Sequence, residues 1–166
     1  MIELTVEHFN FSMLIQTRLW NKGKEKFSRC GMVFDTGASM TAIDTSIASR
    51  SGYSLKAAKE VFVTGVGKSN IPAKRITLIN FELGGVELGP VQVDVLDFPK
   101  DSNTSAVLGM NIIKHFKIIA DFDEKGHDGR DGTIWLRPKF DIKSKPSLES
   151  FTESSRFSDW WASSDS

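Results

Sequence analysis

This 166-residue chain has one cysteine and no long apolar run, so it lacks the sequence features of disulfide-bonded and membrane-spanning proteins. The single cysteine, Cys30, excludes an internal disulfide, and we expect it to be a small buried hydrophobic residue rather than a nucleophile. No apolar run approaches the roughly 18 residues that cross a membrane, and the N-terminal segment lacks the basic start and cleavage site of a signal peptide. We therefore expect a cytoplasmic protein without a membrane anchor.

Charge of one sign is also lacking, since 21 Lys and Arg residues balance 21 Asp and Glu residues. Without a basic excess, neither nucleic acid nor an anionic membrane is an expected partner. The three histidines, His8, His115 and His127, have no metal-ligand spacing, and we expect His115 to be a partly exposed residue on a short helix. The glycine-rich stretches do not extend into a phosphate-binding pattern. No metal or cofactor is predicted.

Most of the chain has the alternating and clustered β-favouring residues of strands separated by Gly-rich turns. A mostly β domain is therefore predicted over residues 1–140, with a short helix after Asp44 and another over 111–116. The expected strands cover residues 2–6, 11–20, 27–34, 60–63, 71–79, 81–83, 91–96, 106–109, 117–122 and 133–136.

The composition changes after Pro138, and residues 141–166 are rich in Ser with scattered charges. Such a composition is typical of a flexible tail. Phe157, Trp160 and Trp161 have helical spacing within it, so a short segment that docks on its own domain or on a partner is the alternative. A tail that occupies a cleft and keeps the protein latent is a further possibility.

The stretch Met32-Val33-Phe34-Asp35-Thr36-Gly37-Ala38-Ser39 carries an apolar strand directly into a carboxylate. An ionised Asp at the end of a buried strand loses hydration that must be offset by hydrogen bonds or a proton. Gly37 allows the backbone to fold tightly against that carboxylate, and the Thr36 hydroxyl can hydrogen-bond a neighbouring loop. The stretch predicts a carboxylate held in position for chemistry.

This turn resembles the active-site turn of the retropepsin-like aspartic proteases. The resemblance covers roughly residues 2–138 and extends to three further features in the order that family has them. They are a glycine-tipped hairpin at Gly65-Val66-Gly67, the apolar pair and glycine Val107-Leu108-Gly109, and a helix-like segment from Asn111 to Phe116. The resemblance implies a single-lobed, closed barrel-like β fold with short helices.

Peptide hydrolysis by carboxylates needs both a base and an acid, and two neighbouring carboxyl groups that share a proton provide both. The sequence has one Asp-Thr-Gly, because Asp44-Thr45-Ser46 lacks the glycine and is predicted to cap a helix. Asp101-Ser102-Asn103 lacks the glycine as well. The second carboxylate must then come from another chain, and the resemblance implies a homodimer with Asp35 of each copy at its two-fold axis.

The resemblance also implies the other site residues. Thr36 would bond across the dimer axis, Gly37 would contact the carboxylates, and Ala38 and Ser39 would line the substrate groove. Gly65, Val66 and Gly67 would form the tip of a flap over an extended peptide or protein substrate. The first hypothesis is an aspartic endopeptidase with catalytic Asp35, and the alternative is a non-catalytic module that dimerises and binds peptides.

Overall fold

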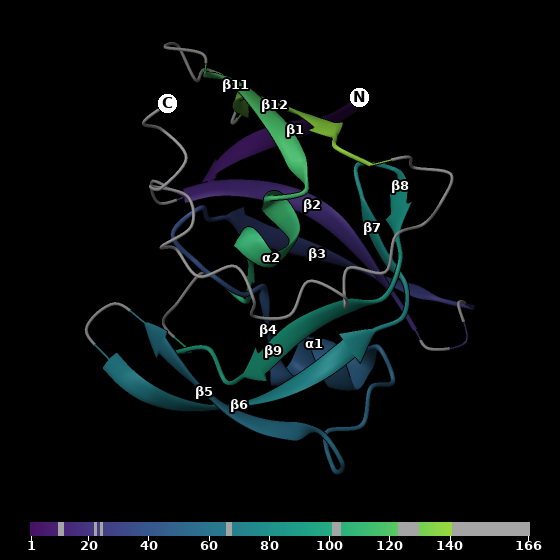
Figure 1. Ribbon diagram of the computed structural model, residues 1–166, viewed down its shortest axis with the longest axis vertical. Helices are drawn as coiled ribbons and strands as arrows, with labels where there is room; N and C mark the ends of the chain where they lie inside the picture. Colours follow the sequence, from purple (N-terminus) through teal and green to yellow (C-terminus); the bar gives the residue numbers. More distant parts are fainter. Residues whose placement is uncertain are drawn as a thin grey trace, which may run out of the picture.

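The computed structural model describes residues 1–9, 12–21, 23, 25–65, 68–100, 104–122 and 130–140, which are mostly β-strand (Figure 1). The strands are β1 (Ile2–Phe9), β2 (Ser12–Trp20), β3 (Phe27–Phe34), β4 (Ala42–Asp44), β5 (Lys59–Gly65), β6 (Lys68–Leu78), β7 (Phe81–Leu83), β8 (Val86–Leu88), β9 (Val91–Leu96), β10 (Ala106–Leu108), β11 (Phe116–Phe122) and β12 (Arg130–Pro138). The helices in these residues are α1 (Thr45–Arg50) and α2 (Met110–Ile113). The predicted mostly β class is confirmed.

The strands pair in the order β11-β12-β1-β2-β3-β10-β4-β9-β6-β5, and β7 and β8 branch from β2. Figure 1 shows the β5–β6 hairpin at one end of the molecule and β11 and β12 at the other. Because these end strands do not pair with each other within the described ranges, the sheet is open. The expectation of a closed barrel was wrong in this respect, although the single-lobed β fold was correct.

The core is built by alternation along the strands. On β3, Cys30, Met32 and Phe34 are buried, while the residues between them are half-buried. Cys30 is only 3 % exposed, so the prediction that it is buried is confirmed. Burial raises the pKa of its thiol to about 11. The core also includes large side chains from other elements, among them Ile15, Leu19, Ile43, Phe81 and Ile112.

The predicted cap of the first helix is confirmed. Asp44 is the N-cap residue of α1, and its side chain accepts a hydrogen bond of 2.8 Å from the Ser46 N–H. Partial burial raises the pKa of Asp44, but hydrogen bonds from Ser46 and the Phe98 N–H lower it further. The pKa of Asp44 therefore lies below its ordinary value of 3.8. Asp44 is therefore engaged in local structure.

The second helix is shorter than the predicted 111–116. It ends at Ile113, and Phe116 already begins β11 opposite Pro138. Phe116 is 3 % exposed and packs edge-on against Phe140, with ring centroids 5.6 Å apart. The two residues between α2 and β11 form a turn, and tertiary packing of the aromatic pair places Phe116 in the strand rather than in the helix.

The predicted tail, residues 141–166, lies outside the described residues, so the division into a domain and a tail stays a prediction. Within the described residues, neither helix has the length and apolarity that spanning a membrane requires.

We expect Gly109→Ala to destabilise the fold strongly. A Cβ atom at residue 109 would lie 2.5 Å from the backbone carbonyl atoms of Met40, although the Gly109 backbone has an ordinary φ of −103°. The clash with backbone should lower the free energy of unfolding by at least about 2 kcal/mol, measured by urea denaturation.

Gly23→Ala is the control for this substitution, because its Cβ would meet only side-chain atoms of Glu25 at 3.6 Å or more. We expect a change below about 0.5 kcal/mol. Equal stability of the two variants would contradict the close approach of Gly109 to Met40.

Candidate active site

Asp35 directly follows the last residue of β3. In the sheet, β10 lies between β3 and β4. β10 pairs parallel with β3, with Val107 opposite Val33, and antiparallel with β4, with Val107 opposite Ala42. The chain from Asp35 to Thr41 therefore passes around the end of β10. The Asp35 N–H donates to the Leu108 carbonyl at 3.1 Å, which fixes where the carboxylate leaves the sheet.

The turn itself folds back on the carboxylate. The Gly37 N–H donates to Asp35 Oδ1 at 2.7 Å, and the Ala38 N–H donates to the Asp35 carbonyl at 3.4 Å. A Cβ atom at residue 37 would lie 3.1 Å from Asp35 Oδ1, tighter than most Cβ contacts. Glycine at this position therefore permits the short hydrogen bond between the Gly37 N–H and Asp35 Oδ1.

Helix α2 holds the other side of the turn. The Met110 N–H donates to the Ala38 carbonyl at 2.7 Å, and the Asn111 N–H donates to the Ser39 carbonyl at 3.0 Å. These bonds use N–H groups of the first helical turn, which have no partner inside a helix. The loop therefore has backbone partners on both sides.

Two residues that the sequence analysis did not single out, Thr41 and Asn111, connect these parts. Asn111 Oδ1 accepts from both the N–H and the hydroxyl of Thr41, at 2.7 and 2.8 Å, and Asn111 Nδ2 donates to the Gln92 carbonyl at 2.8 Å. The Gly109 N–H in turn donates to the Thr41 hydroxyl oxygen at 3.0 Å. The signal in the sequence was weak, because any Thr and Asn can take surface positions.

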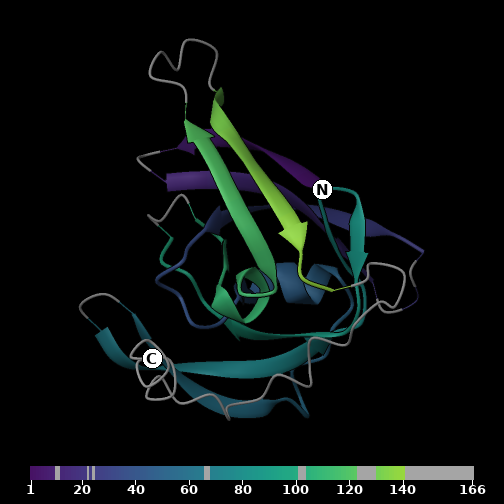
Figure 2. The same cartoon turned by 45° about the horizontal axis from the view of Figure 1, so that its top comes forward.

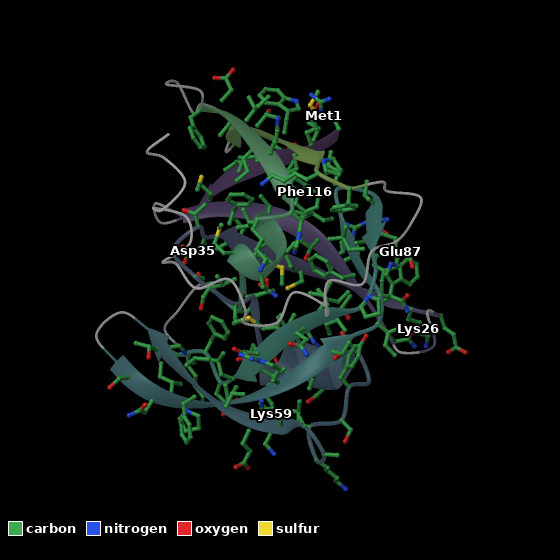
Figure 3. All side chains as sticks on the ribbon, viewed as in Figure 1. Met1, Lys26, Asp35, Lys59, Glu87 and Phe116 are labelled. Carbon is green, nitrogen blue, oxygen red and sulfur yellow. The ribbon has the colours of Figure 1, made fainter. Side chains whose placement is uncertain are left out.

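The predicted site residues in the turn form one contiguous surface segment. Asp35 and Ala38 are half-buried, whereas Thr36, Gly37 and Ser39 are exposed. Within the described part of the chain, the Thr36 hydroxyl makes no hydrogen bond. Figure 3 shows Asp35 at the side of the molecule toward which the tip of the β5–β6 hairpin also projects.

The predicted flap coincides with this hairpin. β5 and β6 pair antiparallel, and Gly65 lies opposite Lys68 after a register shift. Val66 and Gly67, the remaining residues of the predicted tip, lie outside the described residues. Phe62 on β5 is 71 % exposed, so an apolar side chain is available on the hairpin.

A buried ion pair that the sequence analysis missed joins the hairpin to the turn region. Asp94 on β9 is 1 % exposed and accepts two hydrogen bonds from Arg75 on β6, at 2.7 and 3.1 Å. The Asp94 N–H also donates to the Thr41 carbonyl at 2.9 Å. Asp94 therefore contacts both the base of the hairpin and the segment that follows the Asp35 turn. Because its ion pair with Arg75 has two hydrogen bonds, the pair fixes the relative orientation of the two side chains.

His115, expected to be partly exposed, is buried at 8 % exposure. Burial, with the nearby charge of Lys114, lowers the pKa of its imidazole below the ordinary 6.5. The neutral form therefore stabilises the fold, and this contribution is lost as the pH falls below 6.5 through the lower folded-state pKa. No group of three or more metal-ligating side chains occurs in the part of the chain that the structure describes.

A protein-family model described as aspartyl protease matches residues 21–112, just over half of the chain. The chain belongs to this aspartyl protease family. The match spans both the Asp35 turn and the β5–β6 hairpin. A comparison with curated protein sequences gives no significant match to this family member.

This aspartyl protease family member was also compared with solved structures. A retropepsin-like aspartic protease from Rickettsia conorii is 21 % identical, with 81 % of this chain and 91 % of that chain covered and a TM-score of 0.55. EIAV protease complexed with the inhibitor HBY-793 is 19 % identical over 64 % of this chain and 91 % of that chain, with a TM-score of 0.44. The first of these supports the retropepsin-like fold that the ordered motifs predicted. The roles of the individual site residues stay predictions.

We expect Asn111→Leu to destabilise the turn that carries Asp35. The substitution leaves the Thr41 N–H and the Gln92 carbonyl without their partner, which should lower the free energy of unfolding by about 3 kcal/mol. Asn111→Asp keeps the acceptor for the Thr41 N–H and hydroxyl, and replaces the donor to the Gln92 carbonyl with an oxygen, so its loss should be smaller than that of the Leu variant but not zero. Denaturant unfolding of the three proteins tests this order, and a Leu variant as stable as the parent chain would contradict the role of Asn111.

Proposed function

We propose that this protein is an aspartic endopeptidase, a hydrolase that cuts peptide bonds in an extended peptide or protein substrate. Membership of the aspartyl protease family supports the reaction class. The observation that carries the assignment to Asp35 is its position in a turn held by the backbone of β10 and α2, with the Gly37 N–H on its carboxylate. Such a fixed carboxylate needs little reorganisation during reaction.

Two other Asp residues lie near the Asp35 turn, Asp44 along the sequence and Asp94 on strand β9, and both carboxylates already have structural partners. Asp44 caps α1, and Asp94 is buried against Arg75. Neither is available as the second member of a catalytic pair. The proposed site is therefore completed by a second copy of the chain, in an isologous homodimer that brings the two Asp35 side chains together at its axis.

In the proposed reaction, the two Asp35 carboxyl groups share one proton. The ionised group takes a proton from a water molecule, whose oxygen attacks the peptide carbonyl carbon, while the protonated group donates its proton to the carbonyl oxygen. As the tetrahedral intermediate collapses, one of its two hydroxyl groups returns a proton to the ionised Asp35, and the C–N bond breaks. The nitrogen leaves with the proton that the other Asp35 took from water, so the pair again holds one proton. The products are a new carboxyl end and a new amine.

The other predicted residues take supporting roles in this proposal. The exposed Thr36 hydroxyl would bond across the dimer axis, Gly37 orients the carboxylate, and Ala38 and Ser39 line the groove. The hairpin tip at Gly65, Val66 and Gly67 would cover a peptide bound as an extended strand and exclude water. We further propose that residues 1–140 form the catalytic domain of a cytoplasmic enzyme and that residues 141–166 form its tail.

We expect Asp35→Asn to abolish peptide cleavage, because it removes the titratable group and preserves the shape of the turn. The measurement is mass spectrometry of a diverse peptide pool incubated with each protein from acidic to neutral pH. The rate of the variant should be at least about a thousandfold lower.

Asp44→Asn is the matched control, since it also replaces a half-buried Asp by Asn and Asn remains a good N-cap. This variant should cut the same bonds as the parent chain. Retained cleavage by Asp35→Asn would refute the assignment. An absence of cleavage by the parent chain, when it is dimeric, would instead favour the non-catalytic peptide-binding module.

A further inference from the structure

A cavity lies between the β5–β6 hairpin and the loop that follows α1. Its volume is about 380 Å³, and its walls include Phe62 and Pro72 of the hairpin, Leu55 of that loop and Leu96 at the end of β9. The Nζ of Lys74 on β6 donates to the Leu55 carbonyl at 3.1 Å, which joins the hairpin to the loop at the cavity. Figure 2 shows the hairpin along one side of the molecule, across from β11 and β12. The cavity has the volume of a small ligand site.

This cavity is on the other face of the sheet from the one that leads to Asp35. Paired residues of adjacent strands point to the same face, and successive residues point to opposite faces. One row of paired residues runs from the strand before Asp35 to the hairpin, through Val33, Val107, Ala42, Asp94 and Arg75. Phe62 pairs with Pro72, which is three residues from Arg75 and therefore points to the opposite face. An occupant of the cavity leaves the Asp35 face uncovered.

Phe62 gives the cavity an exposed aromatic wall. Its side chain is 71 % exposed, whereas Val61 and Val63, which point to the other face of β5, are half-buried. Exposed aromatic side chains that border a cavity are typical of interaction sites. The cavity therefore suits an apolar, aromatic occupant.

The chain itself carries an aromatic group beyond the described residues. The last described residue is Phe140, and Phe157, Trp160 and Trp161 follow 17 to 21 residues later. Their i, i+3, i+4 spacing places side chains on one face of a helical turn. Arg156 and Asp159 adjoin these aromatic residues. An apolar helix face of this kind binds in grooves lined by apolar side chains.

We propose that residues 157–161 dock in this cavity of their own chain, with the aromatic side chains against Phe62 and Pro72. The 17 residues from Phe140 span roughly 20–25 Å as a coil and up to roughly 55–60 Å when extended. A domain of about 140 residues has a radius of gyration of roughly 14 Å, so the segment can reach the cavity. The tether holds the segment at a roughly millimolar effective concentration, at which even a weak contact is populated.

Docking of this segment joins two parts of the molecule. Because the cavity walls come from both the hairpin and the rest of the domain, the docked segment restrains the hairpin relative to the domain. Charged groups permit the contact, since Lys74 and Glu60 line the cavity and can pair with Asp159 and Arg156. This inference goes beyond the proposed function, because it holds whether or not the protein cuts peptides.

Cross-linking between introduced cysteines tests the docking, since the native Cys30 is buried at 3 % exposure. Asp97→Cys at the cavity is combined with Ala162→Cys beside the aromatic segment. Under mild oxidation of dilute protein, we expect an intramolecular disulfide to form at least about tenfold faster than in the control, measured by mass spectrometry. The control combines Ala162→Cys with Lys26→Cys, an exposed position just before β3 that the same tether can reach.

Two further substitutions show whether Phe62 forms the docking surface. Phe62→Ser, added to the first cysteine pair, should lower the cross-linking rate at least about fivefold. Phe122→Ser, which removes a phenyl ring that is 51 % exposed on β11, should leave the rate unchanged. Both positions are exposed, so neither substitution prevents folding.

Hydrogen exchange gives a second readout in the chain without introduced cysteines. Trp160→Ser/Trp161→Ser should speed the exchange of the β5 amides at least about threefold, because the hairpin loses its restraint.

Equal cross-linking rates at Asp97 and Lys26 overturn the docking, and so does a rate that Phe62→Ser leaves unchanged. A disulfide that forms only between copies overturns docking on the same chain. None of these measurements needs peptide cleavage, so failure of the docking and failure of the proposed catalysis are distinguishable.

Discussion

The arrangement around Asp35 depends on one short strand, β10, inserted between β3 and β4. Two of its three residues pair with β3 and two with β4, Val107 pairing with both, and the Leu108 carbonyl accepts from the Asp35 N–H. Because β10 lies between β3 and β4 in the sheet, the chain that joins β3 to β4 leaves the sheet and passes around the end of β10 as a loop. Gly109 then lets the backbone pass against Met40, and α2 begins where it can bond Ala38 and Ser39. The position of the carboxylate is therefore a consequence of sheet topology.

Buried polar contacts connect this turn to the rest of the sheet. Thr41 is fully buried, yet its N–H and hydroxyl are satisfied by Asn111, and its carbonyl accepts from the Asp94 N–H. Asp94 in turn pairs with Arg75 on the hairpin strand β6. Because each of these groups would be costly to leave unpaired, the turn and the base of the hairpin hold a defined relation. Such a relation suits the proposed role of the hairpin as a flap over the Asp35 carboxylate.

Local sequence signals predicted the elements that local chemistry determines. The alternation from Phe27 to Phe34 gave the strand, and Asp44 followed by Ser46 gave the helix cap. Long-range packing decided the rest. Phe116 joined a strand because it packs against Phe140, and Asn111 and Asp94 took buried roles because partners distant in sequence meet them there. The open ends of the sheet and the burial of His115 likewise depend on contacts that no short stretch encodes.

The central claim is that one active site needs Asp35 from two chains, and mixing the parent chain with its Asp35→Asn variant tests it most directly. With equal amounts allowed to exchange subunits, only pairs of two parent chains would have both carboxylates. The cleavage rate should then fall to roughly a quarter of that of the same total amount of parent protein. A rate of roughly one half, the simple dilution expected for independent chains, would contradict the account.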